Sequence, residues 1–248
     1  MEMLAIAAVA TFFLTAIMAM AGVGAAFILV PIFLALGVEI HAAMATALLL
    51  NAISTSVSTT TFIRKRLVEW RLALPILIVA VVLSPIGVHV SQRLDRHFLL
   101  WLFSGFLIFA SLMMLLYAPK SSGIQRSARS QMLSSLSLGG VAGFVGGLLG
   151  VGGGSIIVPA LVGAGLEPKR ASATASFVVV FASLTGFFAH ATLSGMDYSL
   201  VGATGIASAG GAAFGAWLMS EKLKGQQLKY IIGFVLLGTA VKIIWGLL

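Results

Sequence analysis

Two glycine-rich turns are the parts of this sequence best suited to binding chemistry. Gly22-Val23-Gly24-Ala25 and Gly150-Val151-Gly152-Gly153-Gly154-Ser155 each interrupt a long apolar stretch and precede a short apolar segment that contains a proline. Each turn is expected to end one helix and start another. Free backbone N–H groups at a helix start, with the positive end of the helix dipole, bind an anion without any charged side chain. The two turns therefore predict an anion site built from backbone.

Other interpretations of these glycines are weaker. The sequence has no Gly-Lys-Ser or Gly-Lys-Thr of a phosphate-binding loop, and no strand and distal acid that a dinucleotide site requires. Close helix packing is the main alternative, because Gly143, Gly146, Gly147 and Gly150 form a small-residue face. We favour a substrate-lining role, since packing glycines need not occur at two separate turns.

Polar residues in the apolar stretch after each turn are the second signal. Asn51, Thr55, Ser58 and Thr59 share one helical face, and Asn51 lies near mid-span, where an unpaired amide is costly. Such donors suit an oxyanion that must be held and then released. Taken singly, most of the hydroxyls are better explained as bonding their own i−4 carbonyl. The predicted substrate-binding residues are Gly22, Val23, Gly24, Ala25, Asn51, Thr55, Gly150, Val151, Gly152, Gly153, Gly154, Ser155 and Ser183.

The placement of charge argues against a cation as ligand. All 7 acidic residues fall in loops or at the ends of apolar stretches, whereas cation sites inside membranes usually use embedded carboxylates. His190 is a candidate for proton coupling, with a hydrogen-bonded structural histidine as the favoured alternative. The sequence has no cysteine, no histidine pair with metal-ligand spacing and no Ser-His-Asp set. We therefore expect no metal, no cofactor and no enzyme activity.

The two turns belong to an internal repeat. Shifting the chain by 128 residues places Gly22-Val23-Gly24 on Gly150-Val151-Gly152 and Val30-Pro31 on Val158-Pro159. Residues 21–57 and 149–185 then share 12 identities in 37 positions without a gap. Apolar bias alone would rarely align Gly, Pro, Glu and Thr. Repeats of this kind are typical of secondary transporters, whose binding sites lie where the copies meet.

Composition identifies the elements that carry these residues. The chain is 60% hydrophobic and 9% charged, with a mean hydropathy of +1.11, which is typical of a polytopic helical membrane protein. The net charge of +8 is better explained by basic loops than by nucleic-acid binding. Each copy has four apolar stretches, and the first is too long for one crossing of about 20 residues. The stretches are 3–37, 43–63, 72–91 and 98–117, then 133–166, 171–192, 198–219 and 228–247.

Lysine and arginine positions predict how the long stretch is threaded. If it enters and returns, as two spans or as a re-entrant hairpin, 12 of the 15 basic residues fall on one side. We therefore predict an all-α fold of two inverted repeats, 1–118 and 133–248, joined by a cytoplasmic linker, 119–132. Each repeat is a broken hairpin followed by three transmembrane helices: eight long spans plus short hairpin helices, up to ten segments. Both termini are predicted outside the cell (inner) membrane.

On these residues the chain resembles the TauE/SafE family of sulfite and organosulfonate exporters. The duplicated Gly-Val-Gly segments at 22–31 and 150–159, the following Ala-Thr-Ala helices and the overall length carry the resemblance. It implies transport of a small sulfur-containing or related organic anion, and it leaves room for proton coupling and a homodimer. The first copy has Ala25-Ala26 where the second has Gly153-Gly154, so the two turns are not equivalent.

The functional prediction is a secondary transporter that works by alternating access, with a midplane site between the repeats. The partners expected are the anionic solute and the lipid bilayer, and no nucleic acid. Two alternatives stay open at this point: an anion channel using the same pore, and a membrane scaffold or assembly factor that transports nothing.

Overall fold

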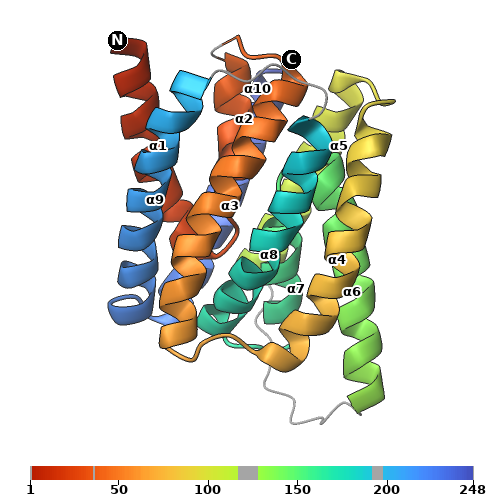
Figure 1. Ribbon diagram of the computed structural model, residues 1–248. Coiled ribbons are helices and arrows are strands. Elements are labelled where there is room, and N and C mark those ends of the chain that lie inside the picture. Colours follow the sequence, from red (N-terminus) through yellow and green to blue (C-terminus); the bar gives the residue numbers. More distant parts are fainter. Residues whose placement is uncertain (1, 36, 117–127, 192–197, 248) are drawn as a thin grey trace.

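The computed structural model describes residues 2–35, 37–116, 128–191 and 198–247, and every element within these ranges is a helix (Figure 1). The helices are α1 (Glu2–Ala21), α2 (Ala26–Ala35), α3 (Ile40–Arg64), α4 (Trp70–Ser91), α5 (Arg96–Leu116), α6 (Ala128–Leu148), α7 (Gly154–Gly163), α8 (Pro168–Ala191), α9 (Tyr198–Glu221) and α10 (Gly225–Trp245). This confirms the all-helical architecture expected from the sequence.

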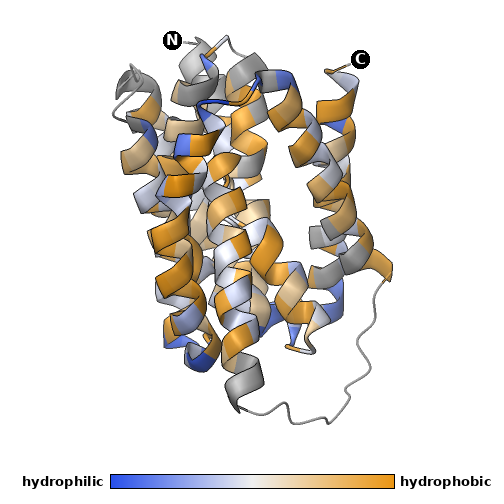
Figure 2. Ribbon diagram, turned by 90° about the vertical axis from the view of Figure 1, so that its right-hand side faces the viewer, coloured by the Kyte–Doolittle hydropathy of each residue, from blue (hydrophilic) through white to orange (hydrophobic). Residues whose placement is uncertain are grey.

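Several of these helices match a membrane in length and polarity. Five are long and apolar enough to span a bilayer: Ala42–Arg64, Trp70–Ser91, Pro168–His190, Val201–Glu221 and Gln226–Trp245. Ala8–Ala21, His97–Phe109, Met132–Leu148 and Gly154–Gly163 are shorter apolar helices. Large apolar side chains such as Phe109, Phe188 and Ile206 are exposed, as expected where lipid would cover them. Hydrophobic residues also occur along much of the length of the helices in Figure 2. The protein is therefore a multi-pass membrane protein.

Helices α3 and α8 form the interior of the bundle and pack against each other. Their spanning segments are 78% and 61% buried, whereas those of α4 and α9 are each 33% buried. Polar side chains line this interior, and Asn51, Ser54, Ser176 and Ser183 are all at most 1% exposed. The bundle thus has an apolar surface and a polar centre.

Two further helix pairs cross at glycine. On α6, Gly139, Gly143 and Gly147 lie so close to the α4 backbone that an added Cβ atom would overlap it. On α9, Gly211 and Gly215 lie equally close to the carbonyl groups of α1. Small residues let helix backbones approach closely in membranes. For Gly143 and Gly147, the packing alternative raised from the sequence is therefore the role that the structure supports.

Two helical hairpins enter the bundle from opposite ends (Figure 1). The hairpin of α1 and α2 starts at the end where α10 finishes, and that of α6 and α7 starts at the other end. Helices α2 and α7 have 10 residues each, so each rises about 15 Å, half of a hydrocarbon core about 30 Å thick. The tips touch inside the bundle, because a Cβ atom on Gly154 would overlap the Val23 carbonyl oxygen.

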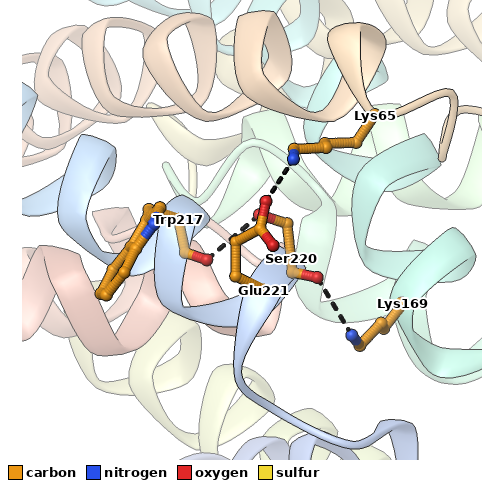
Figure 3. Close-up of polar contacts among 5 residues, drawn as sticks. All are labelled: Lys65, Lys169, Trp217, Ser220 and Glu221. Carbon is orange, nitrogen blue, oxygen red and sulfur yellow. Dashed lines mark hydrogen bonds and ion pairs between the residues drawn. The ribbon is translucent and has the colours of Figure 1, made fainter.

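The end of the bundle at which the second hairpin enters carries a network of charged and polar contacts. Lys65, just after α3, forms an ion pair with Glu221 of α9, and Lys169 donates to the Ser220 carbonyl oxygen at 3.3 Å (Figure 3). Arg170 and Glu69 form a second ion pair at 2.8 Å. The basic segments at 64–71, 169–170 and 222–224 therefore lie at one end of the molecule, which we call the basic end.

Candidate functional site

Asn51 lies where the two hairpin tips meet. Its side chain is fully buried in the middle of α3. The Oδ1 atom accepts a hydrogen bond of 3.4 Å from the Ala26 N–H, in the first turn of α2. The Nδ2 atom donates to the Ser183 Oγ of α8 at 2.8 Å. One amide thus connects the first hairpin to the interior helix of the second half.

The tips require glycine at the positions that face this amide. Gly24 (φ 81°) and Gly152 (φ 71°) have left-handed backbone conformations that other residues seldom adopt. A Cβ atom on Gly24 would overlap the Asn51 Oδ1, and one on Gly152 would lie 2.7 Å from Asn51 Nδ2. Both glycines are therefore needed for conformation and for space.

Each tip also contacts the interior helix that follows the other hairpin. Gly22 lies against the Ser172 backbone of α8, and Ser172 Oγ donates to the Ala21 carbonyl oxygen at 2.8 Å. Gly150 lies against Met44 of α3, whose Cγ would be 2.7 Å from an added Cβ. Ser172 follows Met44 by the same 128 residues that separate the two glycines.

The start of α7 offers hydrogen-bond donors that lack acceptors. Gly153 caps the helix in a left-handed conformation (φ 78°) without a side-chain hydrogen bond. The N–H groups of Gly154 and Ser155 belong to the first turn, where a helix provides no acceptor of its own. Ser155 is 1% exposed, and its Oγ has no hydrogen-bond partner within the described ranges. A group of buried donors of this kind is suited to an anion.

Not all of the predicted residues take part in this arrangement. Gly24, Gly152 and Ser183 each lie against the Asn51 side chain. Thr55 Oγ1 instead donates to the Asn51 carbonyl oxygen of its own helix at 2.6 Å. For Thr55, the alternative of bonding within the helix applies. The other predicted residues lie in the two tips or their flanking turns: Gly22, Val23, Ala25, Gly150, Val151, Gly153, Gly154 and Ser155.

Two positions that the sequence analysis did not select also border the tips. Ser172 holds the end of α1, and Val179 Cγ1 would lie 3.2 Å from a Cβ atom on Gly152. The only signal in the sequence for Ser172 is the 128-residue offset. It would have to be applied to contacts between the two halves, and not to contacts within one half. His190 is fully buried at the end of α8. It lies seven residues beyond Ser183, or about 10 Å along the helix axis, so it does not adjoin the Asn51 contact.

The site is closed in this conformation. A cavity of about 390 Å³ opens near the basic end between α4, α6 and α7, and one of about 350 Å³ lies between α1, α2 and α10. None of the predicted binding residues lines either cavity. Each cavity nevertheless borders one hairpin, at the end from which that hairpin enters. No group of residues capable of holding a metal ion occurs in the part of the chain that the structure describes.

A multi-pass helical bundle with two opposed hairpins and a polar centre has the architecture of a membrane transporter. The family model for the sulfite exporter TauE/SafE matches residues 7–243, so the chain belongs to this family of transporters, and it is not an enzyme. It is 29% identical over 237 residues to the Probable membrane transporter protein YunE of Bacillus subtilis, with 85% of each chain covered.

Two further relatives match different shares of the chain. The Probable membrane transporter protein MJ0441 of Methanocaldococcus jannaschii is 30% identical over 186 residues, which cover 71% of this chain and 68% of that protein. Sulfite exporter TauE/SafE family protein 6 of Arabidopsis thaliana is 45% identical over 62 residues, 25% of this chain and 13% of the plant protein. No solved structure matches the chain.

Proposed function

We propose that this protein is a secondary transporter of a small anion, a sulfur-containing oxyanion or an organosulfonate or related organic acid. The meeting of two hairpin tips at Asn51, each tip ending in the N-terminus of a short helix, is the observation that carries the proposal. The family description, sulfite exporter, agrees with a substrate of this class.

Electrostatics favours an anion at this point. The positive ends of α2 and α7 both face the centre, and helix dipoles act strongly where no water screens them. Every described acidic side chain is exposed or half-buried, so no buried carboxylate offsets these dipoles in the described ranges. An anion held by dipoles and neutral donors, without a fixed cation, would be bound with modest affinity and released readily.

Alternating access is the mechanism we propose, with residues 1–118 and 133–248 as inverted repeats. Helices α2, α3 and α4 begin at 26, 40 and 70, and α7, α8 and α9 begin 128 residues later at 154, 168 and 198. The left-handed glycines at 22, 24 and 37 recur at 150, 152 and 165. Inverted repeats permit one half to rock against the other about a central site. The two cavities would then be the entrances on either side.

The proposed orientation follows from charge. The basic end would face the cytoplasm with the 119–132 linker, because cytoplasmic loops of membrane proteins are enriched in Lys and Arg. Both termini would then be outside the cell (inner) membrane. His190 remains the candidate for proton coupling, since it is the ionisable side chain buried among the described residues of α8.

Reconstitution into liposomes tests the function. Preloaded protein-containing vesicles should take up labelled sulfite or methanesulfonate with saturable kinetics and show counterflow when unlabelled anion is inside. A pH gradient, imposed in either direction, reports proton coupling. Single-channel currents in planar bilayers would instead indicate the channel alternative. Failure of every tested anion to bind or cross would leave the scaffold alternative and reject the proposal.

A further inference from the structure

The two short helices differ in how their N-termini are satisfied. At α2, the Ala26 N–H already donates to the Asn51 Oδ1 at 3.4 Å. The residue 128 positions after Asn51 is Val179, a hydrocarbon side chain that accepts no hydrogen bond. Val179 contacts the second tip beside Gly152. The start of α7 therefore lacks the side-chain acceptor that Asn51 provides at the start of α2.

Two hydroxyl groups beside the second tip add to this excess of donors. Ser155 Oγ is buried without a partner, and its counterpart in the first repeat is Phe27, which has no hydroxyl. Ser183 Oγ accepts from Asn51 and donates to no group within the described ranges. Buried polar groups without partners are rare in proteins, and each one calls for an explanation. Here the missing partner is an acceptor.

We infer that the transporter has one anion-binding half-site, at the start of α7, instead of two equivalent ones. An oxyanion that only accepts hydrogen bonds is held there by the N–H groups of Gly154 and Ser155 and by the Ser155 hydroxyl. Asn51 occupies the corresponding place at α2, so the first hairpin closes the site without sharing the anion. This inference rests on the proposed function, whose site it narrows to one hairpin.

The Ser155→Ala variant tests this assignment, because it removes one oxygen atom and leaves the helix sequence otherwise intact. Loss of a hydrogen bond to a charged ligand should weaken sulfite or methanesulfonate binding by about 10- to 100-fold. The ligand-free protein should melt at the same temperature or higher, because an unsatisfied buried hydroxyl has been removed. A serine with a merely structural role would show the opposite pattern, with lower stability and unchanged affinity.

Ser91→Ala is the matched control. Ser91 is also a buried serine, but it lies at the end of α4 away from the hairpin tips, and its Oγ donates to the Val88 carbonyl oxygen at 2.7 Å. This variant should keep wild-type affinity for both anions. Isothermal titration calorimetry of detergent-purified full-length protein gives the affinities, and the thermal unfolding midpoint is measured on the same samples.

The outcomes separate the inference from the function on which it rests. Wild-type binding with unchanged affinity in Ser155→Ala overturns the half-site and leaves the transport proposal standing. Equal losses of affinity in Ser155→Ala and Ser91→Ala, or lost stability in Ser155→Ala, also overturn the half-site. Absence of binding and transport by the wild-type protein rejects the function and the half-site together. Weakened binding in Ser155→Ala alone, with stability retained, supports both.

Discussion

The Asn51 Nδ2 atom donates a hydrogen bond of 2.8 Å to the Ser183 Oγ, which joins α3 to α8 at the point where both hairpins end. The two residues are 132 positions apart and belong to different halves of the chain. Hydrogen bonds between membrane helices contribute only about 0.6–2 kcal/mol each. Such a bond is strong enough to favour the closed arrangement and weak enough to break during a transport cycle.

Replacing Asn51 with alanine should show how much this amide contributes to stability and how much to transport. The variant removes the acceptor for the Ala26 N–H and the donor to Ser183. We expect a loss of stability of about 1–3 kcal/mol and a fall in the rate of anion uptake of at least about tenfold. Uptake by liposomes and the thermal unfolding midpoint measure the two effects.

Thr60→Ala is the control for Asn51→Ala. Thr60 is an exposed residue of the same helix, and its hydroxyl donates to the Ser56 carbonyl oxygen within α3. Both transport and stability should stay close to wild type in this variant. Normal transport by Asn51→Ala would show that the central amide serves structure alone.

Alanine substitutions at Gly152 and Gly37 distinguish the effect of backbone strain from the effect of steric overlap. Both have left-handed backbones, at φ 71° and φ 82°, so alanine costs about 1–2 kcal/mol at either position. An added Cβ atom meets nothing within 4 Å at Gly37, whereas at Gly152 it would overlap Ser183 and approach Asn51. Gly152→Ala should therefore reduce transport strongly and Gly37→Ala only slightly.

The bulkier Gly152→Val variant should abolish transport and leave membrane insertion largely intact. Insertion is measured as the amount of protein in the membrane fraction. The result that contradicts the site is a fully active Gly152→Val protein, or Gly37→Ala and Gly152→Ala proteins with equal transport. Initial rates of sulfite uptake, normalised to the amount of protein reconstituted, provide the comparison.

The sequence predicted the segments better than it predicted their contacts. Glycine in a left-handed turn has a strong local signature, so the breaks at Gly22–Ala25 and Gly150–Gly153 were confirmed together with the short helices that follow them. The helical period placed Asn51 and Thr55 on one face, but it could not show that Thr55 bonds its own helix. That choice depends on a side-chain rotamer, which no spacing rule determines.

Contacts between halves were harder to predict for a different reason. A repeat shows which positions correspond, but it does not show whether a turn contacts the following helix of its own copy or that of the other. Gly22 contacts Ser172 across the halves, whereas Gly24 contacts Asn51 within its own. The sequence also could not predict that the site is closed, because the same residues form the site in open and closed conformations.

Labelling from one side of the membrane tests the proposed orientation. The chain has no cysteine, so single cysteines can be introduced without a background. Lys65→Cys and Lys222→Cys should react with a membrane-impermeant maleimide only in inside-out vesicles, and Lys242→Cys should react in intact cells. Arg64→Cys, one residue before Lys65 at the end of α3, is a replicate expected to follow Lys65→Cys. Labelling of Lys65→Cys and Lys222→Cys from different sides would reject the topology and the inverted repeats.

A reversible cross-link at the basic end tests alternating access directly. Lys65 and Glu221 form an ion pair between the end of α3 and the end of α9, where both side chains are exposed (Figure 3). A Lys65→Cys/Glu221→Cys protein should be cross-linked by a bis-maleimide that contains a cleavable disulfide, because such a reagent spans the reach of the two side chains it replaces. If these helix ends must separate for the anion to leave, the cross-linked protein should lose most of its transport and regain it when the reagent is cleaved by reduction.

The single variants are the controls for this experiment. Lys65→Cys and Glu221→Cys each remove the ion pair, and an exposed pair contributes at most about 1 kcal/mol, so both should transport at near wild-type rates with or without the reagent. Gel mobility gives the cross-linked fraction, and anion uptake is measured on the same vesicles. Full transport by a completely cross-linked protein would mean that α3 and α9 stay together throughout the cycle. In that case the anion leaves by another route, for which the cavity between α4, α6 and α7 is the nearest opening at that end.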